Sequence, residues 1–290
     1  MKSQRNCSVF ALMMVAALMS SCEKMVLSNS TEVKNDEKVN VVLRVTQFEQ
    51  VPLASMTRAD AGSVCSRLNF AIYDAEGVRK ELVSQKYGDA DFGVASLSLE
   101  EGDYRLVIVG HNGSENPSFK ANEKISIAGK NMTDTFWSTD ELHVGAEGIS
   151  KSFVLRRIVS LVQFVPDDAF PAGLDSIHIF YSGSRGTFDG LTGYGTTKGQ
   201  QHIGLKIEGI DSQIAFYMIP RAENDTLDVT LETFSSAQRL TKKNIDNIPV
   251  RRNSATICRG ILFDNESSTH GISATVTVDD TWDNPIQITF

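Results

Sequence analysis

Cys22 is the residue whose surroundings point most directly to chemistry. It follows small residues and an apolar run over 9–18, and Lys2 and Arg5 precede that run. A basic start, a short apolar stretch and small residues before a cleavage point are typical of a secretory signal. The run is well below the ~20 residues that a membrane-spanning helix needs. The pattern therefore favours a removed leader over a membrane span.

The cysteine itself decides what kind of leader this is. Its context resembles the bacterial lipobox, in which the signal is cut just before the cysteine and lipid is attached to the sulfur. The sequence thus predicts a signal peptide over 1–21 and a lipid-modified mature chain that begins at Cys22. Each buried CH₂ contributes ~0.8 kcal/mol, so several acyl chains, palmitate among them, anchor a protein where one is marginal. The alternative is an ordinary signal peptide and an unmodified cysteine.

The charge balance excludes two classes of partner. The 290 residues carry a formal net charge of −8, and loss of Lys2 and Arg5 with the signal lowers it to −10. An acidic chain lacks the basic surface that binds nucleic acid. It also lacks a polybasic segment for anionic lipid headgroups. Membrane association is expected through the lipid alone.

Composition and cysteine count indicate folded domains without a disulfide scaffold. The chain is 41% hydrophobic and 22% charged, which supplies enough apolar content for a core. Once the signal is removed and Cys22 is modified, Cys65 and Cys258 remain, far apart and without metal-site spacing. Two separate buried thiols are favoured, and one disulfide is the alternative.

Alternation of apolar and polar residues dominates beyond residue 38 and predicts an all-β protein. Residues 22–38 are mostly polar and aperiodic, which predicts a flexible tether. No later stretch has a helical period over three turns. Many short strands separated by Gly, Asn and Asp turns are typical of β-sandwiches, and the length suits two. We expect an N-terminal domain over 39–150 and a C-terminal domain over 151–290.

No group of residues has the spacing of a known catalytic or metal site. HExxH, P-loop and GxSxG motifs are absent from the sequence, and no two of the five histidines stand at i, i+2 or i, i+4. Asp167–Asp168 offers oxygen ligands for calcium but lacks a spaced loop, so turn residues are the favoured interpretation. Trp137 and Trp282 suit core anchors better than a sugar platform. We therefore expect no enzyme activity, metal or cofactor.

The end of the sequence is an apolar strand pattern. Ile286, Ile288 and Phe290 alternate with polar residues, whereas chain ends are usually polar and frayed. One interpretation is a last strand in the chain's own sheet. The other is a donor strand that adds to the sheet of another subunit.

Four segments in a fixed order resemble a known family. They are Arg67–Asp74 with Gly77, Glu101–Asn112, Asp140–Gly145, and Ile248–Thr256 with Gly260. Together with the length and the lipobox they are similar to FimB/Mfa-type fimbrial anchor and accessory subunits, lipoproteins of the fimbrillin superfamily. The resemblance covers nearly the whole mature chain.

The resemblance implies two tandem transthyretin-like β-sandwich domains in a surface-exposed lipoprotein of the outer membrane. Such a protein anchors, caps or joins a fimbrium, supports cell adhesion and takes other stalk or accessory subunits as partners by strand exchange. Stalk subunits of this superfamily are trimmed after a basic residue, which makes Arg44 and Arg58 candidates. The alternative is that both are ordinary basic residues. Base, shaft or tip position and any ligand on a host or bacterial surface stay open.

Two other functions are weighed against this one. An outer-membrane lipoprotein that binds glycans for an uptake system would need exposed aromatic clusters, and the chain has only two tryptophans. A cell-surface hydrolase would need acid/base pairs that the sequence does not display, although carboxylates can converge from distant strands. The structural, non-enzymatic interpretation is favoured over both.

Overall fold

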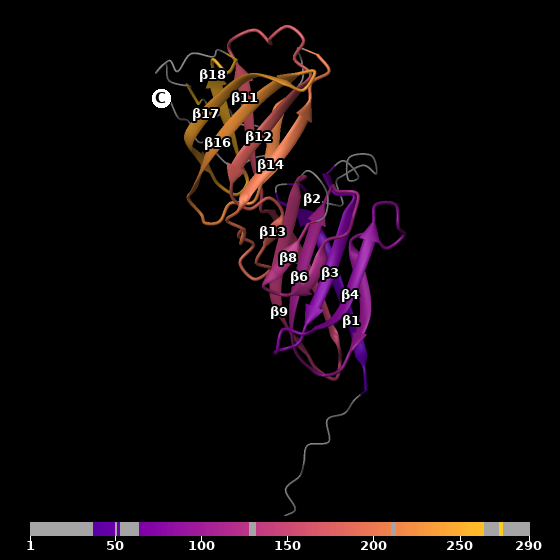
Figure 1. The fold of residues 1–290 in the computed structure, drawn as a ribbon. Coiled ribbons are helices and arrows are strands. Elements are labelled where there is room, and N and C mark those ends of the chain that lie inside the picture. The colour runs from indigo at the N-terminus through magenta and orange to yellow at the C-terminus, as the bar shows by residue number, and fades with distance from the viewer. Residues whose placement is uncertain are drawn as a thin grey trace, which may run out of the picture. The chain divides into compact units, whose positions relative to one another are not determined.

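A computed structural model describes residues 37–49, 51–52, 64–127, 132–209, 213–263 and 273–274. These described residues group into one compact unit. Strands dominate the described residues (Figure 1), which confirms the all-β prediction. The described part holds no helix with the length and apolarity needed to cross a membrane. The predicted signal peptide over 1–21 lies outside the described residues.

The first sandwich is one strand path whose two halves face each other across a core. The path runs β2-β1-β10-β9-β6-β3-β4, and β5 pairs with β1 on the edge opposite β10, which it shares with β2. Side chains of β1 and β10 meet those of β3 and β6 in this core. The strands are β1 (Val39–Phe48), β2 (Val51–Pro52), β3 (Arg67–Tyr73), β4 (Arg79–Lys86), β5 (Val94–Leu99), β6 (Gly102–His111), β9 (Thr135–Val144) and β10 (Ile149–Arg157).

The second sandwich packs two four-stranded sheets face to face. Their orders are β15-β11-β18-β19 and β14-β12-β16-β17. Buried residues of both sheets form a separate core that includes Val162, Ile179 and Leu231. The strands are β11 (Ser160–Pro166), β12 (Ser176–Ser182), β14 (Gln200–Lys206), β15 (Ile214–Met218), β16 (Asp225–Ser235), β17 (Gln238–Val250), β18 (Ser254–Gly260) and β19 (Ser273–Ala274).

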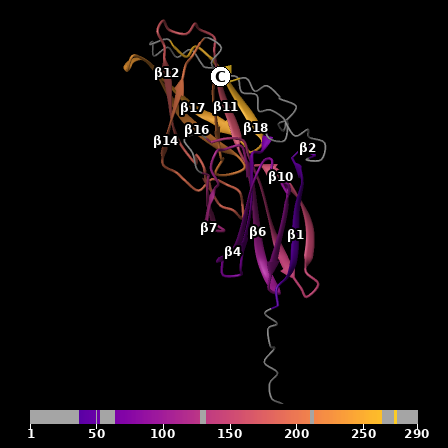
Figure 2. The same cartoon turned by 90° about the vertical axis from the view of Figure 1, so that its right-hand side faces the viewer.

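Both sandwiches use the same connectivity. In each, the first strand lies between an antiparallel neighbour and a parallel strand from late in the domain, as β5-β1-β10 and as β15-β11-β18. The facing sheets also correspond, as β4-β3-β6-β9 and β14-β12-β16-β17. Figure 2 shows β1 beside β10, and β11 beside β18. The fold is therefore a tandem repeat of one sandwich topology.

The strand assignments bear on where the two domains divide. The predicted division between 39–150 and 151–290 falls inside β10, whose Phe153 and Leu155 are buried in the first core. Val162 of β11 is already in the second core. The division stays a prediction, and we propose that the junction is at Ile158–Val159.

A small third sheet covers the outer face of β3 and β6. It consists of β7 (Ser118–Ala121), β8 (Lys124–Ser126) and β13 (Thr187–Phe188), in the order β13-β8-β7. Because it covers that face, both faces of β3 are buried instead of one. The resulting third core joins residues from before and after the proposed junction: Ala71, Tyr73, Val107, Val109, Phe119, Ile125, Met132, Ile158, Val159, Phe188, Ile219 and Ala255.

His111 at the end of β6 is fully buried in the neutral form. Its Nδ1 accepts a hydrogen bond from the Gly113 backbone N–H at 3.0 Å, and its Nε2 has no partner. Burial, with a smaller contribution from the charge of Arg67, lowers the His111 pKa from 6.5 to about 4. The folded state thus resists a proton that the unfolded chain accepts readily.

This difference predicts a pH dependence of stability. Between pH 6.5 and about 4 the unfolded chain binds a proton at position 111 and the folded chain does not, so acid lowers the free energy of unfolding. His111→Gln should remove about 2 kcal/mol of that loss between pH 7 and pH 4.5, measured by urea denaturation. His143→Gln, at an exposed position of the same sandwich, is the control for the substitution itself. Equal slopes for His111→Gln and wild type would contradict the prediction.

Candidate functional site

Among the site residues predicted from the sequence, Arg44 lies in the part of the chain that the structure describes. Cys22 and Arg58 lie outside the described residues, as do Ile286, Ile288 and Phe290 of the predicted donor strand. Arg44 is exposed in the middle of β1, and its Nη1 donates a hydrogen bond to Ser150 Oγ at 2.6 Å. The backbone of Arg44 is aligned with Val94 of β5 on one side and Ser152 of β10 on the other.

The strand that carries Arg44 is an integral part of the first core. Val41, Leu43, Val45 and Phe48 are at most 4% exposed. The intervening Arg44 is exposed, as the alternation predicts. Strand β1 is therefore held by backbone ladders on both edges and by side chains on one face.

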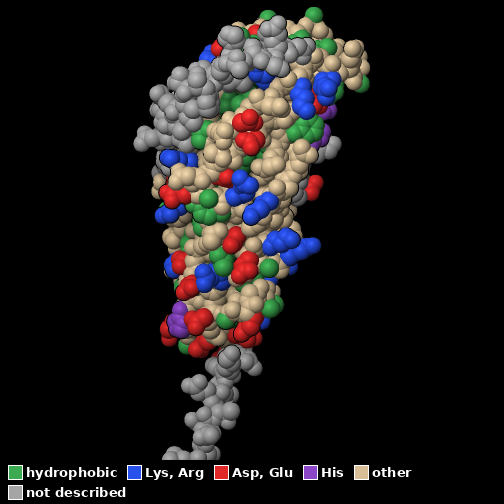
Figure 3. All heavy atoms as spheres, turned by 60° about the vertical axis from the view of Figure 1, so that its left-hand side comes forward, with side chains coloured by type: hydrophobic (Ala, Val, Ile, Leu, Met, Phe, Trp, Pro, Cys, Tyr) green, Lys and Arg blue, Asp and Glu red, His purple; other side chains and the backbone are tan. Residues whose placement is uncertain are grey.

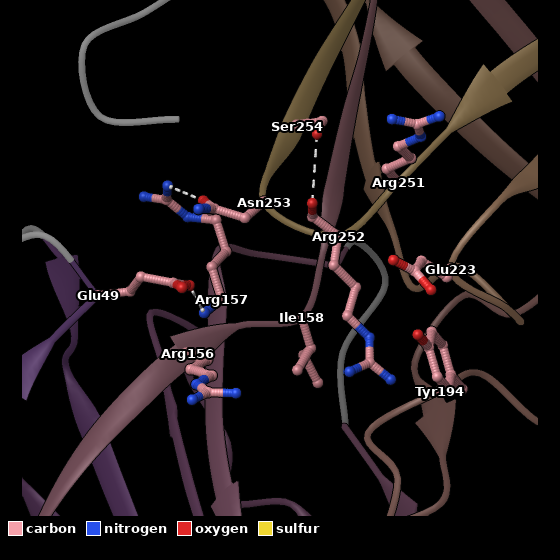
Figure 4. Close-up of a pocket in the computed structure, with 10 residues that line it drawn as sticks. All are labelled: Glu49, Arg156, Arg157, Ile158, Tyr194, Glu223, Arg251, Arg252, Asn253 and Ser254. Carbon is pink, nitrogen blue, oxygen red and sulfur yellow. Dashed lines mark hydrogen bonds between the residues drawn. The ribbon is translucent and has the colours of Figure 1, made fainter. Parts of the chain in front are cut away.

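A hollow opens beside the turn between β17 and β18, and Figure 4 shows the residues that line it. We call it the arginine hollow. Its volume is about 560 Å³. The lining comes from the ends of β1 and β10, two loops and the turn: Glu49, Arg156, Arg157, Ile158, Tyr194, Glu223, Arg251, Arg252, Asn253 and Ser254.

Arg157 is the most buried arginine of this lining, 9% exposed. Its Nε and Nη2 donate to the two carboxylate oxygens of Asp134 at 2.8 and 2.9 Å. Its Nη1 donates to Asn253 Oδ1 at 2.9 Å, and the guanidinium lies 5.0 Å from the Phe136 ring centre. A planar fork with several N–H groups suits this bidentate pairing. Arg157 thereby ties β10 to the turn before β18.

Arg252 is held by an aromatic face. Its guanidinium carbon lies 3.3 Å from the Tyr194 ring centre and 5.8 Å from that of Trp137. Its Nη2 donates to the Thr192 carbonyl, while its buried Nε has no partner. Desolvation lowers the pKa of Arg252. The stacking fixes the side chain in place without consuming all its donors.

Asn253 completes the turn and leaves a donor unused. Its φ of 51° lies in the left-handed region that Asn tolerates better than most residues. Its backbone N–H donates to the Val159 carbonyl at 2.9 Å, and its Oδ1 accepts from Arg157. Because the guanidinium is only a donor, this contact fixes the amide orientation. Nδ2 is then a buried donor without a partner on a side chain that is 3% exposed.

Arg156 and Arg251 add two exposed cations to the hollow. Neither forms an ion pair with any residue that the structure describes. Glu49 is tied to the framework, because its Oε2 accepts the backbone N–H of Arg157 at 2.9 Å. The arrangement therefore offers N–H donors and positive charge, the chemistry that recognises an oxyanion.

The acidic pair Asp167–Asp168, considered above as a calcium site, forms hydrogen bonds and an ion pair within the fold. The Asp168 carboxylate accepts from the N–H groups of Leu262 and Phe263 at 2.9 and 2.7 Å. Asp167 pairs with Arg259 at 3.4 Å. Across the described residues, no three His, Cys, Asp or Glu side chains gather as a metal site. Asp167 and Asp168 lie in the bend that follows β11.

Trp137 and the cysteines are built into the folded interior. Trp137 packs against the third core, and its Nε1 donates to the Gly190 carbonyl at 2.7 Å. Trp282 lies outside the described residues. Cys65 belongs to the first core and Cys258 to the second, both as free thiols, and burial raises each pKa to about 12. The prediction of two separate buried thiols is confirmed.

An aromatic row on the outer face of β14-β12-β16 was missed from sequence. The Phe180 and His202 rings stack at 4.7 Å, and His178 lies 4.9 Å from His202 and 4.6 Å from Phe234. His178 and Phe180 stand two apart on β12, which was a readable signal. The pairing of β12 with β14 and β16 brings His202 and Phe234 next to them, and the sequence alone does not reveal that pairing.

The face drawn in Figure 3 shows how charge is distributed over the surface. Basic, acidic and hydrophobic side chains are interspersed on it. This face has no broad positive field of the kind that binds nucleic acid.

Removal of Arg157 should be strongly destabilising. Arg157→Ala leaves the Asp134 carboxylate without its paired cation, and breaking such a buried pair typically costs about 3–5 kcal/mol. The exposed pair between Arg239 and Glu232 is the control, because Arg239→Ala should cost about 1 kcal/mol or less. Urea denaturation of both variants measures the difference, and equal losses would show that Arg157 does not brace the turn.

Solved structures share the fold at low sequence identity. A candidate adhesin from Bacteroides ovatus aligns with a TM-score of 0.50 at 10% identity, over 84% of this chain and 94% of that one. A candidate polysaccharide-binding protein from Bacteroides thetaiotaomicron aligns at 0.48 and 9%, over 84% and 99%. The fimbrial anchor protein Mfa2 from Porphyromonas gingivalis aligns at 0.43 and 15%, over 77% and 90%. The likeness to the first of these establishes the fold alone.

Comparison of sequences adds a family. No curated protein is a significant match to the chain. One family model matches residues 118–290, from the start of β7 to the last residue of the sequence. Because this match spans more than half of the 290 residues, the chain belongs to the family of unknown function DUF6562.

Proposed function

We propose that this chain is a structural, non-enzymatic subunit of a fimbria, held at the outer membrane by lipid on Cys22. The observation that carries the proposal is the position of β1, an N-terminal strand inserted between β5 and β10. The lipobox-like context of Cys22 and the fold shared with a candidate adhesin support it. Its partners are other fimbrial subunits, and its contribution is to adhesion.

The place of β1 suits strand exchange. Removal of β1 would leave unpaired N–H and C=O groups along β5 and β10 and an apolar slot where Leu43 now packs. A donated strand satisfies such edges through its backbone and fills such a slot through alternate side chains. The first sandwich therefore has a site that a strand from another subunit would fit once β1 has left.

The two candidate cleavage residues would have different consequences. A cut after Arg44 would divide β1 and leave Val45 and Phe48 attached to the sandwich. A cut after Arg58 would release both β1 and β2, and so open the full slot. Arg58 is thus the better candidate for trimming. An uncut chain keeps its slot closed, as an anchoring subunit requires.

The C-terminal segment is the proposed donor. Ile286, Ile288 and Phe290 alternate with polar residues, which is the pattern that a slot with one apolar face selects. Upstream of them, β19 pairs antiparallel with β18 at the edge of its sheet. We propose that this segment enters the open slot of a neighbouring subunit.

Glycan binding for an uptake system is the second candidate function. The observation that favours it is the aromatic row of Phe180, His202, His178 and Phe234 on an outer sheet face. Half-exposed rings present faces against which sugar rings pack. This surface is compatible with a subunit that both assembles and binds a glycan.

Affinity purification from native membranes tests the fimbrial role. With a tag inserted after Ala90, in an exposed turn, we expect β-sandwich subunits by mass spectrometry and filaments by electron microscopy. The mature N-terminus should be a lipid-modified Cys22. Cys22→Ala is the matched variant and should release the protein from the membrane fraction. Co-purification of uptake proteins without fimbrial subunits would favour the second function instead.

The donor strand can be tested one face at a time. Ile288→Asp places a charge on the face that enters the slot, so co-purified subunits should fall at least tenfold. Gln287→Asp places the same charge on the opposite face and should retain them. Equal recovery with both variants would mean that these residues do not donate a strand.

A further inference from the structure

We propose that the C-terminal end of β1 is a latch that stiffens the junction between the two sandwiches. The strand that fills the β1 slot then sets how firmly the second sandwich is held. The latch consists of Phe48, the last residue of β1, and Glu49, which follows it. The inference deepens the proposed function and rests on it for the departure of β1, but the latch itself belongs to the uncut chain and is tested there.

The latch acts on the contact that Arg157 makes across the junction. Arg157 ends β10 of the first sandwich, and its Nη1 donates to Asn253 in the turn before β18 of the second. Asp134 holds the same guanidinium through both carboxylate oxygens. A further bond runs from the Asn253 backbone N–H to the Val159 carbonyl. The position of Arg157 at the end of β10 therefore fixes the turn of the second sandwich.

The first contact of the latch is the carboxylate of Glu49 (Figure 4). Its Oε2 accepts the Arg157 backbone N–H at 2.9 Å, and the Glu49 backbone N–H donates to the Leu155 carbonyl at 2.7 Å. Glu49 thus continues the pairing of β1 with β10 past the end of β1, with a side-chain oxygen as the acceptor. Hydrogen bonds to a charged acceptor are stronger than neutral ones. The end of β1 therefore fixes the backbone of the residue whose side chain reaches the second sandwich.

The second contact is the ring of Phe48. It is fully buried and meets the Phe136 ring edge to face, with 5.1 Å between ring centres and 64° between ring planes. Phe136 is the backbone partner of Arg157 in the pairing of β9 with β10, and its ring centre lies 5.0 Å from the Arg157 guanidinium. Because a protein interior is close-packed, it transmits such a displacement to neighbouring side chains. Loss of Phe48 would leave space beside the ring against which Arg157 packs.

Both contacts lie between the two candidate cleavage residues along the chain. A cut after Arg44 would leave them attached to the sandwich, whereas a cut after Arg58 would remove them together with β1. A first sandwich opened in the second way would hold the turn at Asn253 less firmly. A donated strand with an aromatic side chain followed by an acidic one at these positions would restore both contacts. The junction would thus distinguish partner subunits by the end of the strand that they donate.

Hydrogen–deuterium exchange of the full chain in detergent, followed by mass spectrometry, tests the latch. Glu49→Ala removes the acceptor of the Arg157 N–H, so the turn 251–254 should exchange at least tenfold faster through local opening. Strand β16, at the centre of a sheet in the second sandwich, should exchange as in wild type. Phe48→Leu should act in the same direction. Unchanged exchange of the turn in both variants, or equal acceleration of the turn and of β16, would overturn the proposal.

Two further variants are the matched controls. Thr46→Ala removes a 3.2 Å hydrogen bond from the Thr46 hydroxyl to the Phe153 carbonyl, which joins β1 to β10 upstream of Arg157, and the turn should keep its wild-type exchange. Glu49→Gln keeps an oxygen for the Arg157 N–H and should stay within about threefold of wild type. A turn that exchanges as fast in either control as in Glu49→Ala would overturn the proposal. Recovery of partner subunits is a separate readout, so failure of the latch is distinguishable from failure of the proposed function.

Discussion

The insertion of β1 between β5 and β10 is the constraint on which the first sandwich depends. A strand at the centre of a sheet has no free edge, so its backbone groups are satisfied on both sides. Its apolar face closes the core, and its parallel partner β10 begins more than a hundred residues later in the chain. The sandwich therefore closes only when the two ends of the domain meet. The same arrangement recurs in β11 and β18 of the second sandwich.

The proposed junction follows directly on β10, and this explains why the arginine hollow lies there. Arg157 is the last residue of β10, and Ile158 and Val159 lead straight into β11. The strut from Arg157 to Asp134 and Asn253 joins β10, the segment before β9 and the turn before β18. A long-range clamp of this kind holds the turn in one conformation, including the left-handed backbone of Asn253.

Alternation of apolar and polar residues correctly predicted the strands that bury only one face. In β1 it identified the buried side and the exposed Arg44, because side chains of a strand alternate strictly between two faces. It could not show that Asn69, Ala71 and Tyr73 of β3 are buried too. The strands that cover them are two to four residues long, too short to carry a period. The topological repeat was equally hidden, because it resides in strand order and not in shared residues.

The candidate site was the least predictable part, for a physical reason. Arg157 and Asn253 are 96 residues apart, and only the folded register brings them together. Arg251, Arg252 and Asn253 were noticed in the sequence as part of Ile248–Thr256, one of the four segments that carry the family resemblance, but their partners were not. His202 likewise meets Phe180 only through the pairing of β14 with β12. Spacing along the chain reveals sites built within one element, whereas these are built between elements.

The order of features along the chain limits the roles that one copy of the proposed subunit can perform. Cys22 precedes β1, and both Arg44 and Arg58 lie downstream of Cys22. Cleavage after either arginine would therefore separate the sandwiches covalently from any lipid. A copy that stays lipid-anchored through its own backbone must keep β1, and its slot is then already filled. Such a copy can donate its C-terminal segment but cannot accept a strand at the first sandwich. On the proposed function, an uncut N-terminus thus both keeps the chain attached to the membrane and prevents its first sandwich from accepting another strand. Together these two consequences favour a place at the base of a fimbria.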